Sequence, residues 1–334
     1  MGAGVVGASV AYHLARAGAP VTLIDGAGSP AAGVTGTSFA WIGDAGGDWP
    51  GGAADLRADA LADHRRLESE VPGVAVRWTG SLAWGGAEAP GPGRRWIGPD
   101  RVAALEPRLR TLPDRAVHTP TDGAVDPVGL TRALVHAARG LGARVVLGSA
   151  VSSVATERGR VSGVVSAAGH HAASTVVLAA GTAVPALAEQ IGVRVPVGVS
   201  PALLVRLAAP PGLVRTIVAG PGFEVRELRH GRLLMTAPMP DDPSPVAVRS
   251  AVEDAVERLR AAFRGEVRLL GWGVGARPMP AGGPVVGHLT ADRSAYVAVL
   301  HSAVTLAPTV GRLVAREIVT GRDAPELGRC RPAP

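Results

Sequence analysis

The chain opens with Met1-Gly-Ala-Gly-Val-Val-Gly-Ala-Ser-Val10, and Val21-Thr-Leu-Ile-Asp25 follows it. The pattern G-x-G-x-x-G is met by Gly2, Gly4 and Gly7, and it brings backbone N–H groups at a helix N-terminus to a dinucleotide pyrophosphate. A helical repeat after the glycines, and then an apolar run, complete the order expected of a dinucleotide-binding unit. An ordinary glycine-rich turn is the alternative in a chain with 45 glycines, and the matching context favours dinucleotide binding.

One part of this pattern is missing from the sequence. The glycine turn normally follows an apolar strand in the centre of a parallel sheet, and only Met1 precedes Gly2. We therefore expect the fold to lack its first strand and the phosphate loop to be less firmly shaped. A displaced start of the chain is one explanation, and a variant without this strand is the other. Asp25 stands where a ribose-binding carboxylate is expected.

Length and composition predict a two-domain protein with a large core. The 334 residues suggest two domains, and 47% hydrophobic with 3% aromatic residues indicates an aliphatic interior. No apolar run is long enough to span a membrane and no signal peptide leads the chain, so a cytoplasmic protein without a membrane span is expected. Cys330 alone makes no disulfide or cysteine metal site, and adjacent His170 and His171 cannot face one metal, so we expect none.

The net charge of +6 does not indicate nucleic-acid binding. All 34 basic residues are arginine, and they alternate with acidic residues without a basic run among stacking aromatics. Nucleic acid is therefore not an expected partner.

The order of elements along the chain is mixed α/β. Helices are predicted over 55–70, 99–107 and 128–141, and a hairpin around residues 157–160. From about residue 193 to 275 the pattern changes to antiparallel strands with a helix over 245–263. A final strand pair and a helix over 308–319 return to α/β character.

Short motifs in a fixed order run through almost the whole chain. They are Gly2–Gly7 with Asp25, Gly36-Thr-Ser38, Asp122-Gly-Ala-Val-Asp-Pro127, Val176–Gly181, Gly275-Ala-Arg-Pro278 with Pro284–Gly287, and His301–Pro308. Together they resemble the D-amino-acid oxidase superfamily of flavoproteins, the group with glycine oxidase and sarcosine oxidase. The resemblance implies FAD as the cofactor, and not a nicotinamide.

The resemblance also implies the layout. A Rossmann-like FAD-binding domain is expected from discontinuous segments, residues 1–72, 119–193 and 277–334. An antiparallel-sheet substrate domain is expected from residues 73–118 and 194–276.

Roles in holding FAD follow from the same resemblance. The glycine loop is expected to take the pyrophosphate, Asp25 the ribose, and the backbone of Val151 the adenine. Thr37 and Ser38 lie where the family's loop passes the flavin, although turn capping would explain them equally well. The remaining positions expected to contact the cofactor are Gly181, Thr305 and Leu306. Pro308 is expected in the first turn of the last helix, whose N-terminus would face the flavin.

Arg277 and His301 are the candidate catalytic residues. An arginine pairs bidentately with a carboxylate, and the resemblance assigns Arg277 this role towards the substrate; an ion pair between strands is the alternative. His301 is expected to accept a proton from the substrate amine or to hydrogen-bond the flavin, and a structural histidine is the alternative.

The implied reaction is oxidation of the C–N bond of a small amine or amino acid. Hydride passes from Cα to flavin N5, water hydrolyses the imine, and oxygen or another acceptor reoxidises the flavin. The chain has no lysine to promote the reaction with oxygen, and the position of Cys330 predicts non-covalent FAD. The alternatives are an FAD enzyme for 2-hydroxy acids or alcohols, a non-catalytic flavoprotein-like scaffold, and a nicotinamide dehydrogenase.

Overall fold

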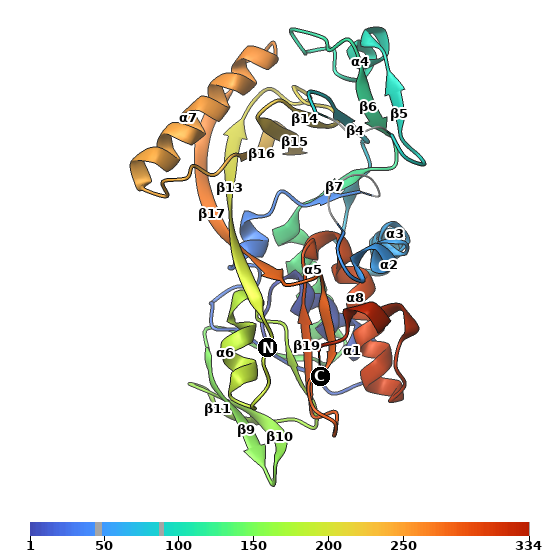
Figure 1. Ribbon diagram of the computed structural model, residues 1–334, viewed down its shortest axis with the longest axis vertical. Coiled ribbons are helices and arrows are strands. Elements are labelled where there is room, and N and C mark those ends of the chain that lie inside the picture. The colour runs from blue at the N-terminus through green and yellow to red at the C-terminus, as the bar shows by residue number, and fades with distance from the viewer. Residues whose placement is uncertain (44–48, 87–89, 334) are drawn as a thin grey trace.

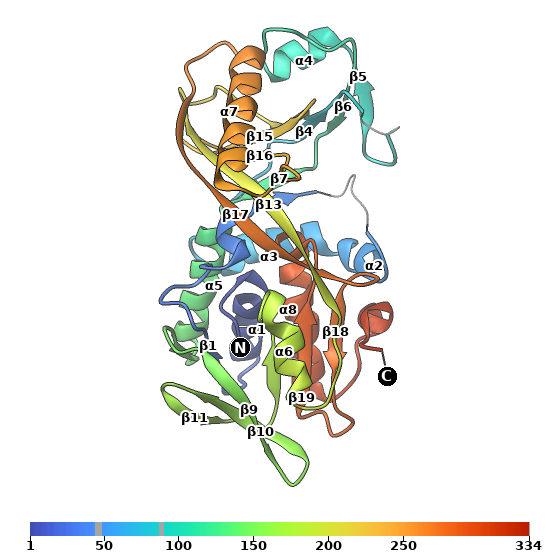
Figure 2. The same ribbon diagram turned by 60° about the vertical axis from the view of Figure 1, so that its left-hand side comes forward.

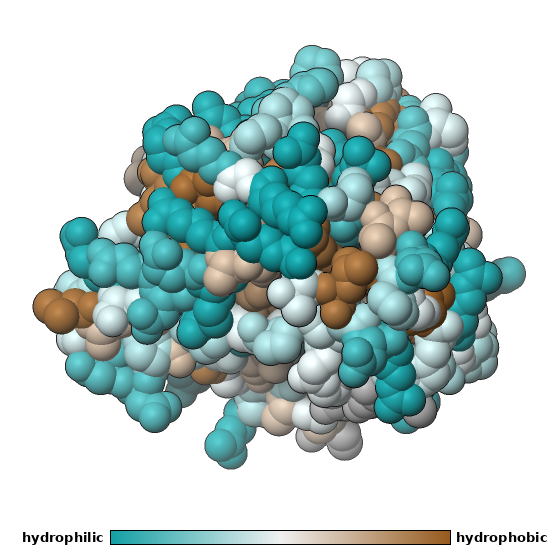
Figure 3. Space-filling view, turned by 90° about the horizontal axis from the view of Figure 1, so that it is seen from above, coloured by the Kyte–Doolittle hydropathy of each residue, from teal (hydrophilic) through white to brown (hydrophobic). Residues whose placement is uncertain are grey.

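The computed structural model describes residues 1–43, 49–86 and 90–333. The molecule is elongated, with two parts in the lower and upper halves of Figure 1. Two long strands run from one part into the other (Figure 2): β13 (Val197–Ala208) and β17 (Arg268–Pro280). Seen from its upper end, the molecule has a mostly hydrophilic surface with apolar residues in small separate groups (Figure 3).

Three helices pack together in the lower part, and they are α1 (Val5–Arg16), α5 (Pro127–Gly140) and α8 (Ala303–Thr320). Helix α1 approaches α8 closely because Gly311 has no Cβ; a Cβ there would lie 2.2 Å from Ser9 Oγ. Ser9 donates to the carbonyl of Ala307 at 2.7 Å, so a buried hydrogen bond joins the two helices. Helix α5 begins at the predicted Asp-Pro pair, where the Asp126 carboxylate accepts from two backbone N–H groups.

The strands beside these helices form two sheets. In the first, β1 (Thr22–Ile24) pairs in parallel with β8 (Arg144–Val146). In the second, β12 (Val176–Leu178) pairs in parallel with β19 (Ala295–Val299), which pairs antiparallel with β18 (Val285–His288). This arrangement of mostly parallel strands beside helices is the α/β class that the sequence predicts.

The first residues of the chain lie between the two sheets. Gly2 N donates to the Ile24 carbonyl at 2.8 Å, and the Met1 carbonyl accepts from Ala179 N at 3.0 Å. The Met1 amino group donates to the Val177 carbonyl at 2.8 Å, and burial lowers its pKa to about 6. Met1 and Gly2 therefore lie at the position of the strand that the sequence pattern lacks, and they hydrogen-bond to both sheets.

A third sheet lies at the lower end of the molecule in Figure 1, and it is formed by β9 (Val151–Glu157), β10 (Arg160–Ser166) and β11 (Gly169–Ala172). The turn between its first two strands has left-handed backbone at Arg158 and Gly159, with φ of 50° and 78°. The hairpin predicted at this position is therefore confirmed.

The upper part is built on one sheet with the described strand order β17, β13, β16, β15, β14, β4, β6, β5. Its shorter strands are β4 (Ser81–Ala83), β5 (Arg95–Ile97), β6 (Ala116–Thr119), β14 (Ile217–Gly220), β15 (Phe223–Arg229) and β16 (Arg232–Ala237). Neighbours are antiparallel except β14 and β4. Helix α7 (Pro245–Ala262) packs an apolar side into the core under this sheet. The antiparallel sheet with one covering helix is as predicted.

The remaining elements are η1 (Val34–Thr37), β2 (Trp41–Ile42), α2 (Ala53–Arg57), α3 (Ala60–Glu70), β3 (Val76–Arg77), α4 (Pro99–Leu105), β7 (Gly123–Val125), η2 (Gly181–Ala183), α6 (Val184–Glu189) and η3 (Pro325–Cys330). They include a small antiparallel sheet with the order β2, β7, β3.

The single helix predicted over 55–70 is wrong, because α2 and α3 are separate. At the break, the Asp59 carboxylate pairs with Arg312 of α8 at 2.8 Å. The predicted domain boundary between residues 276 and 277 falls inside β17, and the domain division stays a prediction.

Candidate active site

A cavity of about 1030 Å³ lies where the two parts meet. On the lower side its wall includes Val5 at the start of α1, the loop with Thr37 and Ser38, and residues 300–305 before and in α8. On the upper side it includes Glu224 and Arg277 from the large sheet. The cavity therefore joins the glycine loop region to the predicted substrate arginine.

The glycine loop leads into α1 as the sequence predicts. A Cβ on Gly7 would lie 1.9 Å from the Gly2 carbonyl oxygen, and Gly2 has a φ of 94°. A Cβ on Gly4 would meet only Thr35 Oγ1, at 3.3 Å. Gly4 is the N-cap of α1, and Thr35 Oγ1 accepts from Val5 N at 3.2 Å. The loop is thus a cradle of backbone atoms at a helix N-terminus, which fits a pyrophosphate.

Asp25 follows β1 beside this cradle. Its carboxylate accepts from Ala3 N at 2.5 Å and from Ala27 N at 2.7 Å, so the side chain is held in place by the backbone. Val151 begins β9, and Gly181 begins η2 with a φ of 58°. These three residues lie outside the wall of the cavity.

The loop after the cradle packs against β17. A Cβ on Gly275 would lie 2.2 Å from Thr37 Oγ1, so this glycine makes room for the loop. Thr37 Oγ1 donates to the Val34 carbonyl at 3.2 Å, and Ser38 Oγ accepts from Ala40 N at 3.2 Å. The structure therefore brings together two motifs that are far apart in the sequence, and both hydroxyls also cap turns.

Helix α8 begins at Ala303, five residues earlier than expected, and Pro308 lies inside it. The expected place of Pro308 in the first turn is therefore wrong. A proline in a helix leaves the carbonyl four residues earlier without its donor, here that of Val304. His64 Nε2 lies 3.2 Å from both the Val304 and the Thr305 carbonyl oxygens and donates to them. This buried histidine from α3 explains how the helix continues through the proline.

Thr305 and Leu306 lie in the first turn and a half of α8. Thr305 lines the cavity, and its Oγ1 donates to the Trp41 carbonyl at 3.0 Å. Leu306 is fully buried and is not part of the wall. The side chain of the N-cap residue, Ser302, makes no hydrogen bond to the first backbone N–H groups of α8.

Arg277 and His301 line the same cavity. Arg277 lies opposite Ser200 in the pairing of β17 with β13, and its Nη2 donates to Ser200 Oγ at 2.7 Å. Its Nε has no hydrogen-bond partner in the described part of the chain, so the guanidinium keeps unused donors. Burial and the Arg277 charge lower the pKa of His301 below its ordinary value. Burial and the nearby arginine therefore both favour the uncharged form of His301.

Sequence reasoning missed Glu224 of β15 and Thr236 of β16. They are directly opposite in the strand pairing, and Thr236 Oγ1 donates to Glu224 Oε2 at 3.3 Å. Burial raises the pKa of Glu224, opposed by the hydrogen bond from Thr236 and the charge of Arg277. Glu224 and Arg226 stand two residues apart, so both side chains lie on one face of the strand. Two charged residues on one strand face were the sequence signal that could have indicated a polar site.

Arg226 is fully buried behind the cavity wall. Its Nε donates to the Phe39 carbonyl at 2.6 Å and its Nη2 to the Val125 carbonyl at 2.8 Å. Burial lowers its pKa to about 9. This arginine fixes the loop around Phe39, which lines the cavity, to the large sheet.

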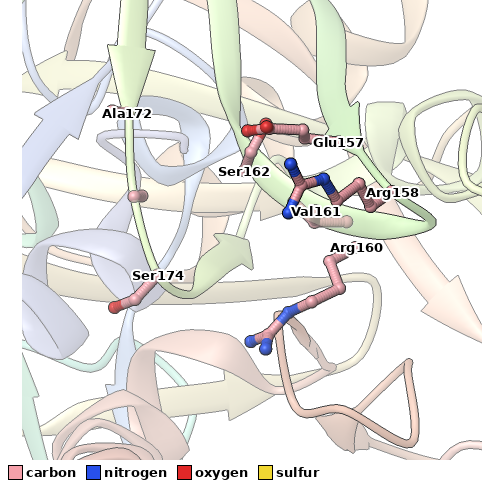
Figure 4. Close-up of a pocket in the computed structure, with 8 residues that line it drawn as sticks. Glu157, Arg158, Arg160, Val161, Ser162, Ala172 and Ser174 are labelled. Carbon is pink, nitrogen blue, oxygen red and sulfur yellow. The ribbon is translucent and has the colours of Figure 1, made fainter.

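A second hollow lies at the far lower end, on the sheet of β9, β10 and β11 (Figure 4). Its side chains, among them Arg158 and Arg160, project from the hairpin, and Arg160 pairs with Asp292 at 3.1 Å. It is separate from the glycine loop and from Arg277. Among the described residues, no cluster of histidine, cysteine and acidic side chains could hold a metal ion, and no helix is long and apolar enough to cross a membrane.

The glycine loop in one part and the arginine-lined cavity between the two parts thus combine a dinucleotide-binding loop with a pocket for a small ligand. Residues 1–317 match the family described as FAD dependent oxidoreductase, and the chain belongs to this family. Membership confirms the predicted superfamily, the FAD cofactor and the oxidoreductase class.

Curated relatives and solved structures agree with this family. Glycine oxidase from Bacillus licheniformis is 28% identical over 347 residues, covering 96% of this chain and 92% of the relative. D-amino acid dehydrogenase from Rhizobium johnstonii is 29% identical over 201 residues, covering 56% of this chain and 47% of the relative. The match thus spans about half the length of that dehydrogenase.

The same fold occurs in solved structures. Glycine oxidase from Bacillus cereus has a TM-score of 0.80 at 20% identity, covering all of this chain and 97% of the other. L-amino acid deaminase from Proteus vulgaris has a TM-score of 0.84 at 19% identity, covering 97% of this chain and 89% of the other. The predicted fold class is therefore confirmed.

Proposed function

We propose that this chain oxidises the C–N bond of a small amine or amino acid that carries a carboxylate. The observation that carries the proposal is the shared cavity, in which Arg277 and His301 meet the N-terminal end of α8. Amino-acid oxidases and dehydrogenases among the relatives support it. When bound, FAD supplies the acceptor of the hydride that leaves the carbon bearing the nitrogen.

We assign the cofactor as the sequence predicts. The cradle of Gly2, Gly4 and Gly7 holds the pyrophosphate through backbone N–H groups, and Asp25 binds the ribose. The backbone at Val151 meets the adenine, and Gly181 gives the nearby turn its left-handed conformation.

The flavin end is assigned to the loop of Thr37 and Ser38 and to the start of α8. The N-terminal turn of α8, which begins at Ala303 and includes Thr305 and Leu306, would direct a partial positive charge towards a bound flavin. Such a preorganised charge stabilises negative charge that develops on reduction. The buried thiol of Cys330, whose pKa burial raises to about 11, lies outside the cavity wall and supports non-covalent FAD.

Arg277 orients the substrate in this proposal. A guanidinium with unused donors pairs with the substrate carboxylate and so presents the adjacent C–H to the flavin. The uncharged form of His301 has a free lone pair on one ring nitrogen, so it accepts a proton from the amine or hydrogen-bonds the flavin. Loss of the hydride then leaves an imine, which water hydrolyses to a carbonyl compound and an amine or ammonia.

The second candidate is oxidation of a 2-hydroxy acid by the same site, since Arg277 would bind that carboxylate equally well. Purified FAD-loaded protein is mixed anaerobically with glycine, sarcosine, proline and D-amino acids, and separately with glycolate and lactate. The proposal expects amines to bleach the visible flavin absorption, with ammonia released from glycine or a D-amino acid and methylamine from sarcosine. Bleaching by the hydroxy acids alone would establish the second candidate. Repeating the reaction with oxygen or a dye identifies which acceptor reoxidises the flavin.

A further inference from the structure

The upper wall of the cavity carries a carboxylate to which the proposed function gives no role. In the described residues, the Glu224 side chain receives one hydroxyl hydrogen bond, from Thr236 at 3.3 Å. A carboxylate offers about four lone-pair sites, so most of its capacity is unused. A polar group in a cavity wall with unused acceptors is suited to a ligand that donates hydrogen bonds.

The charge of Arg277 reaches this carboxylate without forming an ion pair with it. Burial raises the pKa of Glu224, and the Arg277 charge acts in the opposite direction. Among the described residues, Glu224 and Arg277 form no ion pair with each other. A guanidinium and a carboxyl group therefore line one cavity without a direct ion pair between them. An amino-acid zwitterion carries the complementary pair of charges.

The other acidic residue of the described wall is already engaged. Asp122 is fully buried, and its Oδ2 accepts from Trp41 Nε1 at 3.0 Å and from Ser81 Oγ at 2.6 Å. His301 also lines the wall, and an imidazole carries no negative charge. Among the described wall residues, Glu224 is thus the carboxyl group whose oxygens have acceptor capacity available to a ligand.

We infer that Glu224 and Thr236 bind the ammonium group of the substrate while Arg277 binds its carboxylate. The inference rests on the proposed function and deepens it, because it makes the substrate a zwitterionic amino acid. A 2-hydroxy acid presents a neutral hydroxyl to Glu224 and forgoes the charge-assisted hydrogen bond. Glu224 is therefore a specificity-determining residue that favours an amine over an alcohol.

The test uses two ligands that differ only in the amine. 2-Aminoisobutyrate has both charges but no Cα–H, so it binds without being oxidised, and isobutyrate is its partner without the amine. Their affinities for the FAD-loaded protein are measured by calorimetry and by perturbation of the flavin spectrum. We expect the amino acid to bind about 10- to 100-fold more tightly, the range of a hydrogen bond between charged groups.

The variant Glu224→Gln keeps the size and shape of the side chain but removes its charge. We expect it to bind 2-aminoisobutyrate no more tightly than isobutyrate, while its affinity for isobutyrate stays the same or rises. An unchanged flavin spectrum shows that the variant is folded. Glu253→Gln on the exposed side of α7 is the matched control and should behave as wild type. Thr236→Val tests the hydroxyl and is expected to lower the preference by a smaller factor.

Two results overturn the inference. One is equal affinity of the wild-type protein for the two ligands, and the other is a preference that survives Glu224→Gln. Failure of the proposed function looks different: no amine bleaches the flavin, whatever the binding preference. Bleaching by amino acids with an unchanged Glu224→Gln variant would leave the proposed function standing and remove only the role of Glu224.

Discussion

Two substitutions in the glycine loop are expected to have different effects. Gly7→Ala should lower the stability of the apoprotein, and Gly4→Ala should lower its affinity for FAD. At Gly7 a Cβ would lie 1.9 Å from a backbone carbonyl oxygen, and Cβ atoms in real structures essentially never come within 3.0 Å. Overpacking of this kind costs about 1–3 kcal/mol, and the better helix propensity of alanine returns at most about 1 kcal/mol. We expect Gly7→Ala to lower the free energy of unfolding of the apoprotein by about 1–2 kcal/mol.

At Gly4 the new methyl meets only the Thr35 hydroxyl, at 3.3 Å, and the N-cap backbone (φ −72°, ψ 177°) suits alanine. The apoprotein should change by less than about 1 kcal/mol. The same methyl stands where the pyrophosphate approaches, so FAD affinity should fall about 10- to 100-fold, as overpacking by 1–3 kcal/mol predicts.

Thermal and urea unfolding of the apoproteins give the stabilities, and quenching of FAD fluorescence on titration gives the affinities. Gly140→Ala, where a Cβ meets no atom within 4 Å, is the control. Wild-type FAD affinity of Gly4→Ala, or an apoprotein that Gly7→Ala leaves as stable as wild type, would refute this account of the glycine loop.

Three further predictions concern buried groups, and urea denaturation measures each. Arg226→Ala removes the donors to two backbone carbonyls at a fully buried position, so it should lower the free energy of unfolding by about 3 kcal/mol; a loss under about 1 kcal/mol would contradict its role. His64→Leu should cost about 1–3 kcal/mol, and clearly less in a Pro308→Ala background, where the alanine N–H replaces the imidazole donor. Equal losses in the two backgrounds would show that the histidine does not compensate for the proline. Burial lowers the pKa of His13 and of His64 to about 4, below the unfolded value of about 6.5. Between about pH 4 and pH 6.5 the unfolded state binds more protons than the folded state. The free energy of unfolding should therefore be highest above about pH 6.5 and fall towards pH 4 by up to about 3 kcal/mol per histidine. A flat profile across that window would mean that the folded protein protonates them freely.

Local chemistry explains the parts of the fold that the sequence predicts. The glycine loop, the Asp126 cap of α5 and the turn at Arg158 each follow from residues that are neighbours in the chain. Gly275 and Thr37 are different, because each belongs to a recognisable motif but their contact needs the folded β17. The sequence motifs therefore identify which segments form the site, but they do not predict which residues of those segments touch one another.

The errors arise where a distant residue changes a local preference. Proline favours the first turn of a helix, and Pro308 instead lies inside α8 because His64 supplies a donor from another helix. Glu224 was missed for a related reason. Which face of β15 borders the cavity depends on its pairing with β16 and on the position of β17, and a single strand does not reveal this.

The central claim is that Arg277 holds a carboxylate-bearing amine against FAD in the cavity between the two parts. Anaerobic titration of wild type and Arg277→Ala with the amine that bleaches the wild-type flavin tests it most directly. We predict that Arg277→Ala keeps its bound FAD spectrum and needs at least about 100-fold more substrate for the same bleaching, the loss expected for a bidentate charged pair. Bleaching of the FAD-loaded variant at wild-type substrate concentrations would contradict the claim.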